Sequence, residues 1–159
     1  MTDVREPDAP ASGAAKAGTQ DFLASATVTV GANMHDIWAV WVDVNAWKSW
    51  DTGIESTKLH GNFKAGNTFT LTPAGGQPME VTITSATQGE EFSDETVLPF
   101  GTIRTSHRME PLGALVRLTH EVRAEIAEDA VEMFGVKIWP HLQSGLSTAL
   151  NELAEIVAN

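Results

Sequence analysis

The chain has 159 residues and a formal net charge of −11, with 42% hydrophobic and 19% charged residues. This apolar fraction is sufficient for one ordinary globular core. The ten lysines and arginines are scattered, so neither nucleic acid nor an anionic membrane is an expected partner. The sequence contains no cysteine and no tyrosine, which excludes disulfides, thiolate chemistry and phenolic acid–base catalysis.

The first twenty residues are rich in Ala, Gly, Pro and Ser and have no apolar period. Such a segment cannot bury enough surface to offset the entropy of ordering, so we expect residues 1–20 to be a disordered tail and residues 21–159 to form one domain. The N-terminus lacks the pattern of a secretory signal, and no apolar run approaches a membrane span. These features predict a cytoplasmic protein.

The ordered part begins with a strand and two short helices. Apolar and polar residues alternate over residues 24–30, as expected for a strand with one buried face. Asn33 is suited to cap a following helix. Apolar residues then recur at spacings of three and four from Ile37 to Trp50, with a break at Asn45.

Short strands separated by turn residues occupy the middle of the chain. The alternating segments are 54–60, 68–72, 79–84, 92–98, 102–110 and 114–124. Consecutive strands joined by tight turns predict an antiparallel meander.

The chain closes with an interrupted amphipathic helix from Asp129 to Asn159. Its apolar stripe is regular, but Pro140 removes a backbone donor and should kink or restart the helix. Gly145 costs about 1 kcal/mol in a helix interior relative to alanine. Its presence indicates either a close backbone approach or space left for a ligand.

This order of elements, together with VGANMHDIWAVWVDVNAWKSWD, GNFKAGNTFTLTP and LPFGTIRTSHRMEPLGALVRLTHEV, resembles the START-related, birch-pollen-allergen-like superfamily. The nearest branch is the polyketide cyclase/dehydrase-like proteins, over about residues 22 to 157. The resemblance implies an α+β helix-grip fold, in which a seven-stranded curved antiparallel sheet wraps around the C-terminal helix and encloses an apolar cavity. Carriers, receptors and cyclases all occur in this superfamily, so the resemblance implies no single function.

Strand parity directs two histidines into this cavity. Buried neighbours on each strand place Thr105, His107 and His120 on the inner face. A two-residue loop at Leu112-Gly113 would set the histidines diagonally, whereas a four-residue loop would set them directly opposite. Either arrangement gives a ligand contact or an acid–base group, and the alternative is that both are core residues with protein partners.

Asp94 also points inward by parity, where it would raise the pKa of a nearby histidine and assist a general base. We expect it instead to reach water at an edge of the sheet, because a buried unpaired carboxylate is costly. A metal site is not expected, since only the residue types suggest one, and no cofactor is implied.

Four tryptophans lie within thirteen positions, and such rings either fill a core or line a concavity. The expected cavity-lining residues are Trp38, Trp41, Phe69, Met109, His107, His120, Phe134, Trp139 and Leu142. The first hypothesis is a protein that binds an apolar or aromatic small molecule. The second is a cyclase- or dehydratase-like enzyme that uses His107 and Asp94, without a cofactor. The third is a filled cavity and a protein that acts through its surface, for example as a homodimer.

Overall fold

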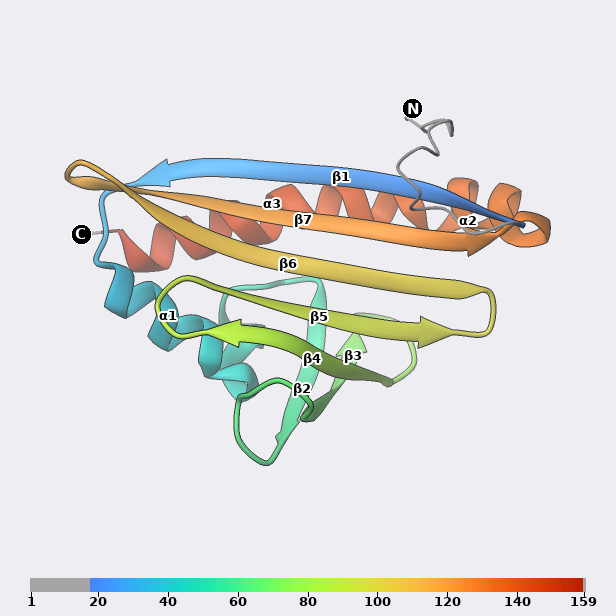
Figure 1. Cartoon of the computed structure of the whole chain (residues 1–159), viewed down its shortest axis with the longest axis horizontal. Helices are drawn as coiled ribbons and strands as arrows, with labels where there is room; N and C mark the ends of the chain where they lie inside the picture. The colour runs from blue at the N-terminus through green and yellow to red at the C-terminus, as the bar shows by residue number, and fades with distance from the viewer. Residues whose placement is uncertain (1–17, 159) are drawn as a thin grey trace.

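Seven antiparallel strands form one sheet in the order β1-β7-β6-β5-β4-β3-β2 in the computed structural model, which describes residues 18–158. The strands are β1 (Thr19–Val30), β2 (Ile54–His60), β3 (Thr68–Pro73), β4 (Met79–Thr87), β5 (Glu91–Leu98), β6 (Gly101–Leu112) and β7 (Leu115–Ala127). The long strands β1, β7 and β6 run together along the molecule, and β2 and β3 cross below them at a steep angle (Figure 1). The predicted meander is confirmed, with β1 paired against β7.

Helices follow the first strand and end the chain. They are α1 (Met34–Val42), the 3-10 helices η2 (Val44–Ser49) and η3 (Glu128–Ala130), α2 (Val131–Lys137) and α3 (Trp139–Val157). The Asn33 side chain accepts a hydrogen bond from the backbone N–H of His35 at 2.7 Å, so Asn33 is the N-cap of α1. The second of the two predicted short helices is the 3-10 helix η2.

The C-terminal helix is divided near Pro140, as the sequence predicts. Ile138 separates α2 from α3, and Pro140 lies in the first turn of α3, where its missing N–H would have no helical partner. α3 packs against β1 and β7. The fold is therefore the expected α+β arrangement of a curved sheet and a long C-terminal helix (Figure 1).

Buried side chains form two cores. The main core contains residues from α1, η2, the middle strands and the second half of α3, including Trp41, Phe69, Phe92 and Leu153. The second core lies under α2 and consists of Phe22, Val122, Ala124, Ile126, Phe134 and Trp139. The polar cavity residues described below lie between these two cores along β5, β6 and β7.

The outer face of the sheet carries ion pairs. Arg104 bonds Glu95 at 2.9 Å and Arg123 bonds Asp21 at 3.0 Å, and Arg108 and Arg117 each lie within 4 Å of a glutamate. These four arginines keep 41–53% of their side-chain surface exposed. They point away from the face that meets α3, because alternate residues of β6 and β7 face opposite sides.

The first strand starts earlier than predicted. Residues 1–17 of the expected tail lie outside the described residues, but Thr19 and Gln20 already belong to β1 and pair with Ala127 and Ile126. These two pairs extend the antiparallel pairing of β1 with β7, so the ordered part of the chain begins before residue 21. Among residues 18–158, no helix is both long enough and apolar enough to cross a membrane.

Candidate functional site

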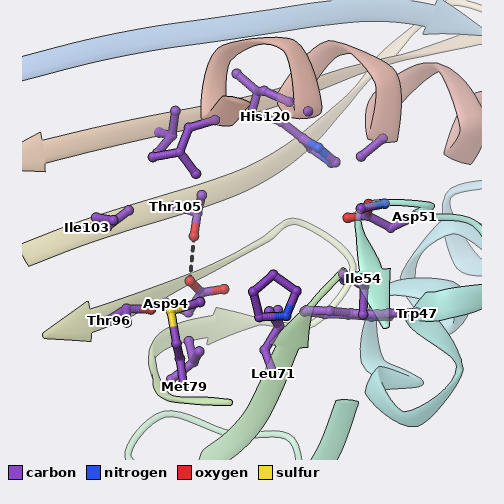
Figure 2. Close-up of a pocket in the computed structure, with 18 of the residues that line it drawn as sticks. Trp47, Asp51, Ile54, Leu71, Met79, Asp94, Thr96, Ile103, Thr105 and His120 are labelled. Carbon is purple, nitrogen blue, oxygen red and sulfur yellow. Dashed lines mark hydrogen bonds between the residues drawn. The ribbon is translucent and has the colours of Figure 1, made fainter. Parts of the chain in front are cut away.

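A cavity of about 630 Å³ lies between the inner face of the sheet, α3 and the segment around η2. The sheet contributes residues of β3 to β7, η2 and the residues after it contribute Trp47, Trp50, Asp51 and Ile54, and α3 contributes five residues. Figure 2 shows these side chains converging from the strands and from the η2–β2 segment. The volume is in the range that holds a drug-sized molecule.

Most of the cavity wall is apolar. Phe69, Leu71, Met79 and Val81 line it from the neighbouring strands β3 and β4. Opposite the sheet, Gly145 of α3 lines it as well, and a Cβ added there would meet no atom within 4 Å. Of the two explanations offered by the sequence, Gly145 therefore leaves open space and does not allow a close backbone contact.

The two inward histidines lie directly opposite each other on β6 and β7. His107 pairs with His120 in the register of the sheet, and the centres of their rings are 4.6 Å apart. Pairing extends to Leu112 and Leu115, and Gly113 in the turn has φ +65°. This is the register of the second prediction, with the histidines directly opposite, but the turn consists of the two residues Gly113 and Ala114 and not of the four-residue loop expected for that register.

His107 is held by Phe92, its neighbour on β5. The two rings stack with centres 3.9 Å apart and planes 6° apart, and Nδ1 lies 3.3 Å from the Phe92 carbonyl oxygen. A carbonyl can only accept, so in the neutral ring Nδ1 carries the hydrogen and Nε2 has the free lone pair. Burial lowers the pKa of His107 to about 4, against a smaller opposing effect of the Phe92 bond, and the ring is neutral near pH 7.

His120 is more deeply enclosed and less well satisfied. The residue is 3% exposed, and its Nε2 has no hydrogen-bond partner among the described residues. Burial, followed by the proximity of His107, lowers its pKa well below the usual 6.5. Its imidazole points into the pocket in Figure 2. Its Nε2 is therefore a buried polar atom whose hydrogen-bonding capacity is unsatisfied by the protein.

Asp94 lies one step further along the sheet from the histidine pair. It is opposite Thr105, whose hydroxyl donates a hydrogen bond to Oδ1 (Figure 2). Asp94 is only 6% exposed, so the prediction that it reaches water at an edge is wrong: β4 and β6 flank it and the cavity lies above it. Desolvation raises its pKa to about 7, although the Thr105 bond acts in the opposite direction.

Asp94 does not hydrogen-bond His107. The carboxylate has Thr105 as its hydrogen-bond partner, and His107 uses the Phe92 carbonyl. The two groups instead form part of a polar strip along the cavity floor, in which Thr96 and His120 also take part. Asp94 therefore does not fix the tautomer of His107, and the Phe92 carbonyl does.

The predicted lining residues divide into two groups. Phe69, His107, His120 and Leu142 line the cavity, as does Asp94. The remaining predicted residues pack elsewhere: Trp38, Trp41, Met109, Phe134 and Trp139. Four of them are corrected to buried core positions, and the half-buried Trp38 packs against the main core and the Phe63 ring.

These core positions have specific partners. Trp41 is fully buried and packs edge-on against Phe92 and His107, so it supports the histidine from behind. Phe134 and Trp139 pack around Phe22 in the second core. Trp139 therefore does not close the cavity.

The sequence does not predict the lining residues of the segment after α1, among them Trp47, Trp50 and Asp51. The tryptophans belong to the dense run that the sequence shows, but helical spacing does not say which rings face a cavity. Trp50 is 6% exposed and its Nε1 has no hydrogen-bond partner. Burial raises the pKa of Asp51, and the nearby charge of Glu152 raises it further. The hydrogen bond from the Gly53 N–H acts in the opposite direction.

A comparison with protein-family models shows which family the chain belongs to. Residues 22–156 match the model described as polyketide cyclase/dehydrase and lipid transport. The protein belongs to this family. Comparison with curated proteins finds no match. Among residues 18–158, no group of three or more His, Asp or Glu side chains is arranged to hold a metal ion.

Solved structures with the fold of this polyketide cyclase/dehydrase family member come from plants and bacteria. Norcoclaurine synthase from Thalictrum flavum has TM-score 0.69 and 11% identity, over 89% of this chain and 96% of that protein. A hypothetical protein from Helicobacter pylori has TM-score 0.74 and 13% identity, over 99% and 97%. Ginseng major latex-like protein 151 from Panax ginseng has TM-score 0.71 and 13% identity, over 87% and 99%. At these identities the comparisons show the fold alone.

The site of this family member combines an apolar enclosure with a short polar strip. The strip holds a carboxyl group with a pKa near 7 and two imidazoles that stay neutral at that pH. Such groups can orient a ligand by hydrogen bonds, and a carboxyl group with this pKa can exchange a proton at neutral pH.

Proposed function

We propose that the protein binds an apolar or aromatic small molecule in the cavity between its sheet and α3. The observation that carries the proposal is the cavity of about 630 Å³, which reaches from the sheet to the exposed Gly145 of α3, where an added Cβ would meet no atom within 4 Å apart from the helix's own backbone. The apolar side chains of β3 and β4 face this space. Family membership agrees, since the family description includes lipid transport.

One structural relative suggests the size of such a ligand. Norcoclaurine synthase from Thalictrum flavum was solved in complex with dopamine and hydroxybenzaldehyde, with TM-score 0.69 and 12% identity to this chain. Both are small aromatic molecules, and a cavity of about 630 Å³ is large enough for a molecule of this class.

Binding can be tested by filling the cavity from α3. A neutral fluorescent apolar probe such as Nile red, titrated into the protein, should bind with enhanced emission and should change the emission of Trp47 and Trp50 in the cavity wall. Gly145→Met should weaken binding at least about tenfold, because the added side chain occupies the open space. Ser147→Met, at an exposed position of α3 outside the lining, is the matched control and should bind as the parent does.

The stability of these variants separates occlusion from misfolding. Replacing a helix-interior glycine should not lower the free energy of unfolding, so Gly145→Met should lose affinity without losing stability. Equal affinity in all three proteins would contradict binding at this site. Absence of binding by any member of a diverse apolar panel would favour a protein that acts through its surface.

A second candidate, a cyclase- or dehydratase-like enzyme, is favoured by the pKa of Asp94. A carboxyl group that titrates near pH 7 inside an apolar cavity can remove a proton from a carbon next to a carbonyl and return it to a departing hydroxyl. In this proposal Asp94 is the acid–base group, and neutral His107 binds a substrate hydroxyl. Asp94→Asn should abolish turnover of a poly-β-ketone substrate and retain its affinity, while loss of both would count against catalysis.

A further inference from the structure

The permanently charged or acidic side chains of the cavity wall are all of one sign. Among the described residues that line it, there are two carboxylic acids, Asp51 and Asp94, and no lysine or arginine. Four of the arginines form ion pairs on the outer face of the sheet. A ligand carboxylate or phosphate would therefore find no permanent positive charge in the cavity, and both acidic side chains would oppose it.

The polar atoms of the strip mainly accept hydrogen bonds. Asp94 Oδ1 receives the Thr105 hydroxyl, and the second carboxylate oxygen has no hydrogen-bond partner among residues 18–158. His107 presents an unprotonated Nε2, because its Nδ1–H is directed at the Phe92 carbonyl. A molecule that satisfies these atoms must bring N–H or O–H donors.

Two aromatic side chains line the same cavity as Asp94. Trp47 and Phe69 both line it, with ring centres 5.1 Å apart and planes at 76°. The Trp47 ring is fixed by a 3.0 Å hydrogen bond from its Nε1 to the Trp41 carbonyl oxygen. Fixed indole and phenyl faces stack with aromatic ligands and attract cations.

We propose that the cavity selects a basic amine with an aromatic or apolar body. The protonated amine bonds the free oxygen of Asp94, and the body packs against the Trp47–Phe69 pair and extends into the space at Gly145. This inference rests on the proposed binding function and specifies its ligand class. An ammonium group supplies the donors that the strip lacks. It also compensates a buried carboxylate, which is costly when unpaired and stable when paired and hydrogen-bonded.

The surroundings of Asp51 fit the same ligand class. Asp51 lies beside Glu152 of α3, which raises the pKa of Asp51, so two acidic groups meet there without a cation among the described residues. Glu152 also accepts hydrogen bonds from the N–H and hydroxyl of Thr52. Together with a net charge of −11, this acidic margin favours the approach of a cation over that of an anion.

Three ligands with one skeleton test the selection: 2-naphthylmethylamine, 2-naphthylmethanol and 2-naphthylacetic acid. Titration calorimetry at pH 8 keeps the amine protonated and Asp94 largely ionised. The other titratable groups in the wall are Asp51, His107, His120 and His141. We expect the amine to bind at least about tenfold more tightly than the alcohol, and the acid to bind most weakly.

Two matched variants show which carboxylate is responsible for the preference for the amine. Asp94→Asn should reduce the affinity of the amine to about that of the alcohol, and a parent-like circular dichroism spectrum and melting curve would show that the variant is folded. Asp51→Asn should keep most of the preference for the amine. Loss of the preference in Asp51→Asn alone would overturn the assignment to Asp94.

The parent protein separates the two proposals. If the alcohol binds and the amine binds no better, the ligand class is wrong and the binding function stands. If none of the three ligands binds, the binding function fails and the ligand class fails with it.

Discussion

Asp94 shows how one buried side chain couples the stability of the protein to pH. Its pKa is about 7 in the folded protein against an ordinary value of 3.8, because the cavity and the flanking strands remove water from the carboxylate. The folded protein therefore holds a proton between these pH values that the unfolded chain releases. The free energy of unfolding must then fall as pH rises through this window, and ionised Asp94 lowers stability above it.

Asp94→Asn should remove this dependence. We expect the variant to match the parent near pH 4 and to exceed its free energy of unfolding at pH 8 by at most about 4 kcal/mol, the equivalent of three pKa units. Urea denaturation at both pH values measures the difference. Glu155→Gln, at an exposed position of α3, is the control and should show no such gain. A variant less stable than the parent at pH 8 would contradict the assigned burial cost.

His107 should have the opposite effect on stability. The pKa of His107 is about 4 in the folded protein and 6.5 ordinarily. Between these pH values the unfolded chain binds a proton, whereas the buried ring stays neutral. Stability from this group is complete above pH 6.5 and is lost as pH falls towards 4, by at most about 3 kcal/mol.

Comparison of His107→Gln with the parent isolates that loss. The free energy of unfolding of the variant should decrease less between pH 7 and pH 4.5 than that of the parent, as measured by urea denaturation. The exposed His35→Gln is the matched control and should follow the parent. Parallel curves for parent and His107→Gln would show that the ring is not buried as a neutral base.

Residue-level prediction from the sequence succeeds where it depends on strand parity. Alternation alone directs Thr105, His107 and His120 inward, and all three line the cavity. The exposure of Asp94 could not be predicted in this way, because it depends on which strands flank β5 and on the position of α3. The same limit applies to Trp41: helical spacing shows that its ring is buried, but not whether the ring faces a cavity or packs against Phe92.

At the scale of elements, local signals determine where helices break and long-range pairing determines register. Pro140 predicts the division between α2 and α3 because its effect on the backbone is local. The turn between β6 and β7 allows two registers from sequence, and the choice depends on the complete ladder of pairs from Gly101–Ile126 to Leu112–Leu115. The direct opposition of His107 and His120 follows from that ladder.

The glycines of α3 and β6 have opposite reasons to be present, and alanine substitution should distinguish them. Gly145→Ala should raise the free energy of unfolding by about 0.5–1 kcal/mol, since the methyl group meets no atom within 4 Å and the helix gains propensity. Gly101→Ala should lower it by about 1–3 kcal/mol, because the new Cβ would lie 2.4 Å from the Glu125 carbonyl oxygen. Thermal or chemical denaturation measures both, and a loss of stability in Gly145→Ala would show that the space above it is occupied.

At the scale of the whole molecule, different parts of the sheet support the second core and the cavity. The second core under α2 joins the far ends of β1 and β7 to the start of α3, whereas the cavity lies over the middle strands. The resemblance inferred from sequence gives the overall architecture correctly, because the order of strands and helices is sufficient to select it. It does not say how the volume enclosed between the sheet and α3 is divided into packed and empty parts, since that division depends on individual side-chain packing.

Phe134→Ala should therefore separate stability from ligand affinity. Phe134 is fully buried and its ring contacts Phe22, Phe100 and Trp139, none of which lines the cavity. Its truncation should lower the free energy of unfolding by about 3–5 kcal/mol and leave Nile red affinity within about twofold of the parent at a temperature where the variant is folded. Leu142→Ala is the comparison, because Leu142 both packs on the second core and lines the cavity, and its truncation should change affinity as well as stability. A large change of affinity in Phe134→Ala would mean that the second core and the cavity are one cooperative unit, because the ligand would then sense packing that it does not touch.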